Sequence, residues 1–279
     1  MNFLTHPAIT PTGIWFFGLR FNYYGLIVGL AMLVFYSVIN ILAKKERNPH
    51  FSDLYFLGLV VSALVGARIW HLVTDFQLYL DDWWQAFYIW RGGLSILGAI
   101  GVGLLYSLAW WRVKNLSWSA MRHNLDMAIF ALPLAQMIGR FANYLNQELP
   151  GRPTSLPWAM SLEPAVRPEG FEYYEGFHPL FAYESIVLLA LFFVFLLGWK
   201  KGWLRFGSGK LSCLYFLIYG SMRFFLDFLR IEPKTGLGLG KNQLFLLFLF
   251  LSLFFIMVVK KIVGQRSFQQ VFRKVVRCK

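Results

Sequence analysis

The chain has 279 residues, of which 57% are hydrophobic and 19% aromatic, and it carries a formal net charge of +13. With a mean hydropathy of +0.52 it is too apolar for an ordinary soluble domain. The positive charge gathers in short segments between apolar runs. Membrane topology and anionic headgroups explain it there, so we do not expect a nucleic-acid partner.

Several apolar runs reach the roughly 20 residues that a helix needs to cross a hydrocarbon core, and no alternation suggests a membrane barrel. The sequence therefore predicts an all-α, multi-pass integral membrane protein with seven transmembrane helices. The predicted spans cover residues 23–42, 54–73, 93–111, 124–145, 179–198, 211–229 and 242–259. We expect one seven-span domain over residues 1–259, followed by a basic cytoplasmic tail over residues 260–279.

The distribution of Lys and Arg predicts the orientation of the spans, because basic residues resist transfer across the membrane. One set of connections, together with the tail, holds 17 of the 27 basic residues, and the opposite set holds seven. We therefore expect the N-terminus outside and the C-terminus in the cytoplasm. Cys213 and Cys278 both fall toward the cytoplasmic side, which argues against a disulfide. No cluster of ligand residues suggests a metal or a cofactor.

Three arginines fall inside the predicted spans, where an ionisable residue needs a partner, a wet cavity or a function. Arg68, Arg140 and Arg223 each lie about five or six residues from the outer end of a helix, at a similar depth. Helical spacing of three or four residues predicts that polar neighbours share their faces. These neighbours are Gln136, Asn143 and Gln147 around Arg140, Tyr219, Asp227 and Arg230 around Arg223, and His71 after Arg68, with Tyr24 at the same level of the first span.

Taken singly, these arginines have simpler explanations. Arg223 and Asp227 can form an ion pair one helical turn apart, and Arg68 can reach the outer headgroups. Together, however, three guanidinium groups outnumber the one carboxylate that we assign to them, and an uncompensated charge in hydrocarbon costs at least about 2.5 kcal/mol. Because guanidinium groups bind phosphate well, we expect an outward-facing cavity for a phospholipid headgroup. The spacing leaves a lipid enzyme, a lipid transporter and an anion channel open.

A continuous motif crosses from the fourth span into the next connection and reads Gly139-Arg140-Phe141-Ala142-Asn143-Tyr144-Leu145-Asn146-Gln147-Glu148-Leu149-Pro150-Gly151. It resembles the signature of the prolipoprotein diacylglyceryl transferases. Further matches follow in chain order: Tyr24-Gly25, Gly66-Ala67-Arg68, Gly92-Gly93-Leu94-Ser95, His178-Pro179, Tyr183-Glu184, and Tyr219-Gly220 with Arg223 and Asp227. The resemblance covers nearly the whole chain and excludes only the basic tail.

The resemblance implies a reaction. The diacylglyceryl group of phosphatidylglycerol would be joined as a thioether to the lipobox cysteine of a prolipoprotein, with release of glycerol 1-phosphate, as the first step of lipoprotein maturation. It implies seven spans in a bacterial inner membrane with the active site toward the periplasm. The signal-peptide and lipobox region would be the protein partner, and we expect a monomer. The alternatives are a non-catalytic binder or transporter of anionic lipid, or a membrane protein whose arginines pair with another chain.

The same resemblance, read beside the polar faces, assigns roles to individual residues. Fixed arginines would stabilise the negative charge that develops on the departing phosphoglycerol. The predicted catalytic residues are Arg140, Arg223, Tyr24 and Asn143. The predicted phosphatidylglycerol ligands are Arg140, Arg223, Asn146, Arg68, Tyr219 and Gly151, and the predicted supporting residues are Glu148, His178, Glu184, Asp227, Arg230 and His71.

One position departs from the pattern. Leu97 stands where many relatives carry a histidine that has been proposed as the base. Three interpretations follow: a positive field lowers the pKa of the substrate thiol without a histidine, His71 or His178 replaces it, or the chain is a divergent paralogue with reduced or altered activity. His178 before Pro179 also fits a helix cap or a packing residue.

The external segment between the fourth and fifth spans, about residues 147–178, is long for a connection. A loop of this length is usually either functional or disordered. We expect it to cover the mouth of the cavity and to help admit the signal peptide of the substrate. A merely solvated loop is the alternative.

Overall fold

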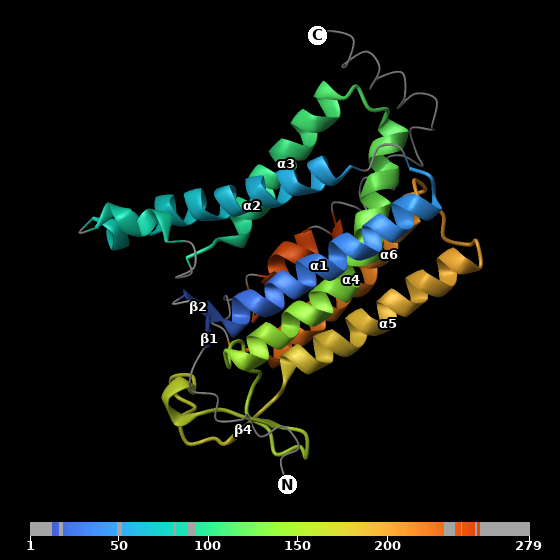
Figure 1. Ribbon diagram of the computed structural model, residues 1–279. Helices are drawn as coiled ribbons and strands as arrows, with labels where there is room; N and C mark the ends of the chain where they lie inside the picture. The colour runs from blue at the N-terminus through green and yellow to red at the C-terminus, as the bar shows by residue number, and fades with distance from the viewer. Residues whose placement is uncertain are drawn as a thin grey trace.

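The computed structural model describes residues 13–16, 19–48, 52–80, 82–88, 93–231, 238–240, 242–248 and 250–251. Helices dominate these residues (Figure 1). The long helices are α1 (Tyr23–Lys45), α2 (Asp53–Thr74), α3 (Ile96–Val113), α4 (Trp118–Leu145), α5 (Leu180–Lys200) and α6 (Lys210–Leu226). Two 3-10 turns, η1 (Phe76–Tyr79) and η2 (Trp83–Phe87), lie between α2 and α3, and η5 (Asp227–Leu229) continues α6.

The prediction of an all-helical membrane protein is confirmed. Within the described residues, α1, α2, α4, α5 and the combined α6–η5 segment are long and apolar enough to cross a membrane. The helix α3 is apolar but shorter. Of the predicted seventh span, residues 242–248 and 250–251 are helical, and the rest lies outside the described residues, as does the tail 260–279.

Four helices form a bundle, and the other two form a hairpin beside it. Figure 1 shows α1, α4, α5 and α6 packed together, with α2 and α3 leaning away from them. The bundle is held by an apolar core in which the Phe130 ring of α4 meets Phe195 and Trp199 of α5 and Phe206 of the next connection. This core lies toward the end of α1 that carries Lys44 and Lys45.

Glycines set the spacing within the α2–α3 hairpin. A Cβ atom on Gly66 would collide with the Gly98 carbonyl oxygen, and a Cβ on Gly98 would collide with the Gly66 carbonyl oxygen. The two backbones therefore touch, as small residues allow in membrane helices. Below this contact the Ser95 amide donates to the Ala67 carbonyl at 3.0 Å. Part of the Gly66-Ala67-Arg68 motif thus serves packing.

Local capping explains where two helices begin. Ser117 accepts a hydrogen bond from the Ala120 amide at 3.1 Å, so α4 starts at Trp118 and not at residue 124 as predicted. The additional turn is polar and extends past the apolar run. At the start of α6, the buried Asp126 of α4 accepts from the Gly209 amide at 3.0 Å and from the Ser212 hydroxyl at 2.9 Å. A carboxylate at a helix N-terminus satisfies otherwise unpaired amides.

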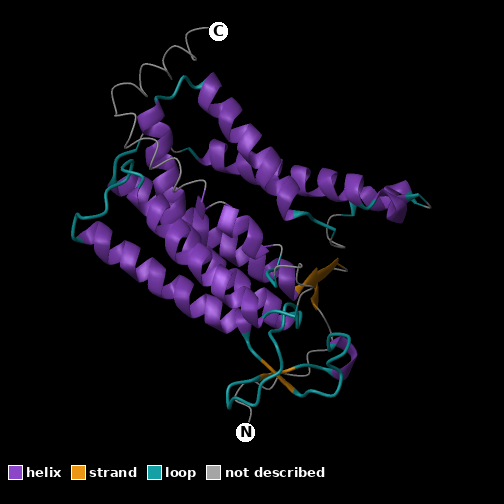
Figure 2. Ribbon diagram, turned by 180° about the vertical axis from the view of Figure 1, so that it is seen from behind, coloured by secondary structure: helices purple, strands orange, loops and turns teal. Residues whose placement is uncertain are grey.

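Two short hairpins lie outside the helices (Figure 2), and the all-α prediction did not include them. One pairs β1 (Gly13–Phe16) with β2 (Leu19–Asn22) just before α1. The other pairs β3 (Met160–Ser161) with β4 (Gly176–Phe177). Strands of two to four residues carry too little periodicity to be recognised in a sequence.

The second hairpin belongs to the segment of residues 147–178, here called the outer cap. It has a hydrophobic core of its own, in which Met160, Leu162 and Phe177 pack with Phe181 of α5. The outer cap is therefore a folded element and not a merely solvated loop. It lies at the end of the bundle where α4 ends and α5 begins (Figure 1).

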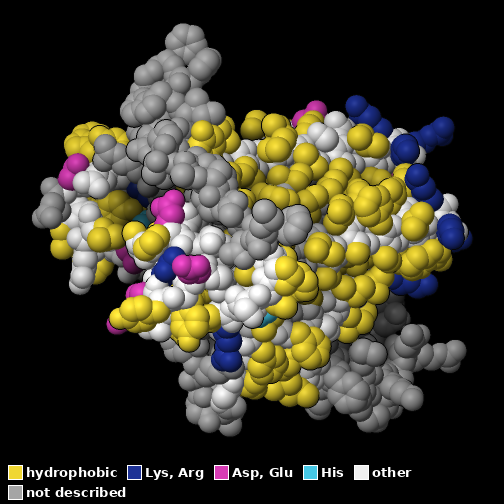
Figure 3. Space-filling view, turned by 90° about the horizontal axis from the view of Figure 1, so that it is seen from below, with side chains coloured by type: hydrophobic (Ala, Val, Ile, Leu, Met, Phe, Trp, Pro, Cys, Tyr) yellow, Lys and Arg dark blue, Asp and Glu magenta, His cyan; other side chains and the backbone are white. Residues whose placement is uncertain are grey.

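The surface of the molecule has the character of a lipid-facing protein. Large apolar side chains such as Leu33, Leu105 and Ile186 are exposed. In Figure 3 hydrophobic side chains cover much of the flank, and Lys and Arg side chains crowd one end. Exposed apolar area on this scale is stable in hydrocarbon and not in water.

Candidate active site

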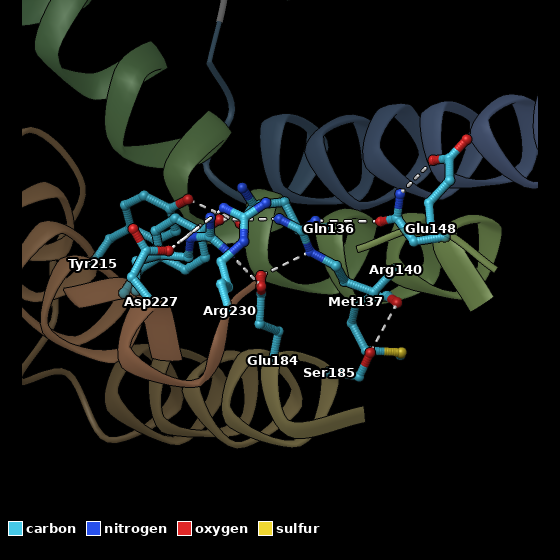
Figure 4. Close-up of polar contacts among 12 residues, drawn as sticks. Gln136, Met137, Arg140, Glu148, Glu184, Ser185, Tyr215, Asp227 and Arg230 are labelled. Atoms are coloured by element: carbon cyan, nitrogen blue, oxygen red, sulfur yellow. Dashed lines mark hydrogen bonds and ion pairs between the residues drawn. The ribbon is translucent and has the colours of Figure 1, made fainter. Parts of the chain in front are cut away.

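The polar cluster at the end of the bundle beside residues 147–178 centres on Glu184, in the second turn of α5. Its side chain is only 3% exposed. Arg140 of α4 places Nε 2.8 Å from Glu184 Oε2, as an ion pair without the alignment of a hydrogen bond. Arg223 of α6 pairs with Oε1 of the same carboxylate. Dashed lines in Figure 4 join Glu184 to guanidinium groups from the neighbouring helices. One carboxylate therefore links three helices.

This contact corrects the charge count made from the sequence. Helical spacing assigns only Asp227 to the three arginines, but Glu184 pairs with two of them. A buried carboxylate is expensive to desolvate, and two guanidinium groups offset that cost. Arg140 and Arg223 therefore both have a partner within the protein, but the single charge of Glu184 balances only one of the two guanidinium groups.

The ion pairs continue along α6 and η5. Asp227 Oδ1 lies 3.7 Å from Arg223 Nη2 and 3.4 Å from Arg230 Nη1. Acidic and basic groups thus alternate from Arg140 through Glu184, Arg223 and Asp227 to Arg230. Three guanidinium groups share two carboxylates, which leaves one positive charge in excess within this chain of ion pairs.

Arg140 is oriented by side chains from two helices. Its Nη1 donates to Asn143 Oδ1 and its Nη2 to the Tyr219 hydroxyl, each at 3.3 Å. The Tyr219 ring stacks on Tyr215 with centroids 5.3 Å apart, and the Tyr215 hydroxyl donates to Gln136 Oε1 at 2.8 Å. The predicted polar faces of the fourth and sixth spans therefore meet, with Tyr215 as a member that the sequence did not reveal.

Glu148 closes the cluster on its outer side. Its carboxylate accepts hydrogen bonds from the side-chain amide of Asn143 at 3.2 Å and from that of Asn146 at 3.0 Å. The cavity between Glu148 and the arginines is narrow, about 10 Å³, which holds about one water molecule. When ionised, Glu148 offsets the excess positive charge. It also occupies two amide donors that could serve an anionic oxygen of a ligand.

Comparison with known proteins shows which family the chain belongs to. The model of the family described as prolipoprotein diacylglyceryl transferase matches residues 12–259. The chain belongs to this family. The resemblance noted in the sequence is thereby confirmed, and the protein is a membrane-embedded transferase.

Individual relatives carry the name phosphatidylglycerol–prolipoprotein diacylglyceryl transferase. The Cutibacterium acnes protein is 39% identical over 199 residues, which are 70% of this chain and 65% of the relative. The Thermotoga maritima protein is 35% identical over 77% of this chain and 72% of its own length. The Gloeobacter violaceus protein is 34% identical over 81% of this chain and 82% of its own length. The chain therefore spans slightly less than two thirds of the first relative and more of the other two.

The backbone contacts of Gly151, the last residue of the signature motif, explain why a glycine is needed at this position. The Gly151 amide donates to the His178 carbonyl at 3.0 Å, and a Cβ atom at Gly151 would lie 2.6 Å from His178 Cβ. Beside it, the Arg152 amide donates to the Leu229 carbonyl at 2.6 Å. These two bonds join the beginning of the outer cap to its end, just before α5, and to η5. A side chain at Gly151 would disrupt the first of them.

The backbone around Glu148 is strained. Gln147 and Leu149 both have positive φ, at 52° and 56°, in the left-handed region that side chains rarely adopt. Gln147 was expected to share a face with Arg140. It lies instead past the end of α4, and its Oε1 accepts from the Glu163 amide at 2.8 Å. This turn aims Glu148 at the cluster and fastens the outer cap.

Arg68 and His71 belong to a different polar cluster on the α2–α3 hairpin. Arg68 donates to three backbone carbonyl groups. Its Nε donates to the Ala86 carbonyl at 2.8 Å, its Nη1 to the Gly93 carbonyl at 3.0 Å, and its Nη2 to the Gln85 carbonyl. His71 Nδ1 lies 2.8 Å from Asp75. A Cβ at Gly93, where φ is +72°, would lie 2.5 Å from the His71 ring. These contacts favour a role for Arg68 in shaping the connection.

Three further predicted positions differ in their surroundings. Tyr24, in the first turn of α1, is half-exposed. His178 Nδ1 lies 3.1 Å from the Tyr183 hydroxyl, at the entry of α5. Leu97 is 61% exposed on the first turn of α3. A lipid-facing leucine thus stands where many relatives are expected to carry the histidine.

Proposed function

We propose that this protein transfers the diacylglyceryl group of phosphatidylglycerol to the lipobox thiol of a prolipoprotein, forming a thioether and releasing glycerol 1-phosphate. The observation that carries the proposal is the pair Arg140 and Arg223, held across Glu184 in a shielded cavity. The names of the related enzymes supply the donor and the acceptor.

The proposed chemistry is a displacement at carbon. The substrate sulfur attacks the CH₂ of the diacylglyceryl group that is bonded to the phosphate. A carbon–sulfur bond forms and the carbon–oxygen bond to the phosphate breaks. The bonding electron pair stays on the phosphate oxygen. Arg140 and Arg223 stabilise that charge where it develops, and removing one such preorganised group typically costs about 10²–10³ in rate.

Headgroup binding requires the cavity to widen, because a phosphodiester is larger than the present space. Arg140 is bound to Asn143 and Tyr219 by bonds of 3.3 Å, which are long and readily exchanged. The amides of Asn143 and Asn146 become available when Glu148 turns away. We propose that phosphate oxygens take the place of the Glu148 carboxylate, with Tyr24 and Gly151 bordering the site.

The thiol also has to lose its proton. We propose that the positive field of Arg140 and Arg223 favours the thiolate, and that the departing phosphate monoester accepts the proton. Leu97 then requires no replacement. His178 and His71 are engaged with Tyr183 and Asp75 and act in this proposal as supporting residues.

We further propose the membrane arrangement expected from the basic residues. The chain would form a seven-span domain over residues 1–259 in a bacterial inner membrane, with the N-terminus outside and the tail 260–279 in the cytoplasm. The site would face the periplasm, and the protein would act as a monomer. The match of the family to residues 12–259 and the crowding of Lys and Arg at one end support this arrangement (Figure 3).

The deciding experiment follows two labels at once. Phosphatidylglycerol labelled in its acyl chains and in its headgroup is incubated with the protein and a lipobox peptide. We expect acyl label on the peptide and released glycerol phosphate, and neither with a peptide carrying Ser in place of Cys. Arg140→Ala and Arg223→Ala should each lose at least about a hundredfold in rate. Arg152→Ala, at an exposed position of the outer cap, is the matched control.

The outcome that contradicts the proposal is equally clear. Folded, lipid-bound protein that leaves both labels on the phospholipid would be a binder or transporter. Headgroup release without peptide labelling would indicate hydrolysis, and would overturn the assignment of a thiol acceptor.

A further inference from the structure

A second cavity lies at the opposite end of the helices from Glu184. It has a volume of about 200 Å³ and separates the α2–α3 hairpin from the bundle. Its walls are mainly apolar and include Ile39 of α1, Leu59 of α2, Leu108 of α3 and Ala128 of α4. Ala128 precedes Arg140 by about 18 Å along α4, so this cavity is distinct from the proposed active site.

Among the described residues, the buried polar groups at this cavity are paired, with one exception. The Tyr55 hydroxyl bonds the Ser107 hydroxyl at 3.0 Å, and Asn124 accepts from Asn48 at 2.6 Å. Trp111 also lines the cavity, and its indole Nε1 is buried and finds no acceptor among the described residues. A buried donor without an acceptor is costly, so this position calls for a ligand oxygen.

Two cations stand beside the same wall. The Arg112 guanidinium lies 5.6 Å from the centre of the Trp111 ring, and the Lys114 ammonium lies 5.1 Å from that of Trp110. Both basic side chains are exposed, whereas both tryptophans line the cavity. An apolar cavity thus has a positive rim. That combination matches an acyl chain joined to an anionic headgroup.

We propose that this cavity binds one acyl chain of an anionic phospholipid, with the phosphate accepting a hydrogen bond from Trp111 Nε1 and pairing with Arg112 and Lys114. This lipid is not the substrate, because it lies at the other end of the bundle. The cavity opens between membrane-spanning helices, where acyl chains are the surrounding solvent. The bound chain would fill the space between the hairpin and the bundle.

The test counts tightly bound lipids on the full chain by native mass spectrometry, after delipidation and titration with phosphatidylglycerol or phosphatidylcholine of the same chains. Leu108→Trp fills the cavity, and Leu105→Trp makes the same change at an exposed position of α3 that does not line it. We expect Leu108→Trp to bind one phosphatidylglycerol fewer than the wild type. Leu105→Trp should bind the full number.

The headgroup contacts are tested separately. Trp111→Phe retains the ring and removes the donor, and a hydrogen bond to a charged group of this kind corresponds to about a tenfold change in affinity. Arg112→Gln with Lys114→Gln should weaken binding of the same lipid, whereas Lys201→Gln, at an exposed basic position just after the end of α5, should not. Phosphatidylcholine should bind this site more weakly than phosphatidylglycerol.

Three results would overturn the proposal. One is an unchanged lipid count in Leu108→Trp. Another is equal affinity for the two headgroups at this site. The third is a lipid that binds there only after removal of residues 260–279, because the cavity would then belong to the tail of the chain and not to a phospholipid.

Discussion

At the scale of single residues, Glu184 and Gly151 show two ways in which a side chain supports the site without having to touch a substrate. Glu184 holds Arg140 and Arg223 from different helices at one carboxylate. Gly151 permits the two ends of the outer cap to approach each other at the His178 backbone. Each role depends on geometry that spans elements far apart in the chain.

Glu184→Gln tests the first role. The substitution keeps the shape and removes the charge that two guanidinium groups share, so they should repel each other and lose their orientation. Breaking a buried ion pair on one side typically costs about 3–5 kcal/mol. We expect a clear drop in melting temperature and a transferase rate at least about tenfold lower. The exposed Glu169→Gln is the control, and wild-type activity in Glu184→Gln would contradict the positioning role.

Gly151→Ala should reduce activity because the new Cβ would lie 2.6 Å from His178 Cβ and 2.9 Å from the His178 carbonyl oxygen. The base of the outer cap has to move away from α5 to admit it. Gly139→Ala changes the same motif at a position where a Cβ would meet nothing within 4 Å. We expect normal activity from Gly139→Ala and a loss of several-fold or more from Gly151→Ala in the same assay.

The burial of His178 predicts that the folded protein loses stability as the pH falls. Burial lowers the pKa of His178 below its usual value near 6.5. The neutral form is therefore favoured in the folded protein, and the unfolded chain takes up the proton first as the pH falls. Stability should be lost as the pH drops through about 6.5, and the loss should level off below the folded-state pKa. Melting temperatures between pH 7.5 and 5 should fall more for the wild type than for His178→Gln.

At the scale of elements, side chains that lie outside a helix determine where two of the helices begin. Ser117 caps α4 from its own connection, whereas α6 is capped by Asp126 of α4. The second arrangement fixes the start of α6 against α4 at the basic end. Tyr219 and Arg223, further along α6, therefore meet Arg140 at the other end with a defined register.

Asp126→Ala should destabilise the bundle because it leaves the Gly209 amide and the Ser212 hydroxyl without their shared acceptor. Loss of a helix cap typically costs about 0.5–2 kcal/mol. We expect a measurable fall in melting temperature, with Asp126→Asn intermediate because its amide oxygen still accepts. Identical melting curves for the wild type and Asp126→Ala would show that the cap carries no stability.

At the scale of the whole molecule, the distribution of polar and apolar side chains is the reverse of that in a water-soluble protein. Apolar side chains face outward along the flanks, while the ion pairs lie inside the bundle. Folding in lipid favours this arrangement, since hydrocarbon solvates leucine and excludes unpaired charge. The orientation across the membrane is a separate matter, decided by the basic ends.

The proposed orientation can be tested by labelling single cysteines in intact cells, in a background lacking Cys213 and Cys278. Tyr173→Cys lies on the outer cap at a position that is 95% exposed, and Lys201→Cys lies at the basic end. A membrane-impermeant maleimide should label the first and reach the second only after the cells are opened. The reverse pattern would place the active site in the cytoplasm.

The sequence by itself determined the membrane class, the approximate positions of the five spans that the described residues contain, and the family. Apolar runs of spanning length depend only on local composition, and the Gly139-to-Gly151 motif is continuous, so both can be recognised before any folding. The spacing of Arg140 with Asn143, and of Arg223 with Asp227, likewise follows from helical periodicity. These inferences need no contact between distant segments.

Only the tertiary structure decided which charges neutralise one another. Glu184 is separated from Arg140 and Arg223 by long stretches of chain, so no local spacing joins the three, and Asp227 seemed to stand alone. Arg68 looked equivalent to the other arginines at its depth, yet its helix leads it to the carbonyls of the α2–α3 connection. Depth in a membrane is a property of one helix, whereas the partner of a buried charge is set by how the helices pack.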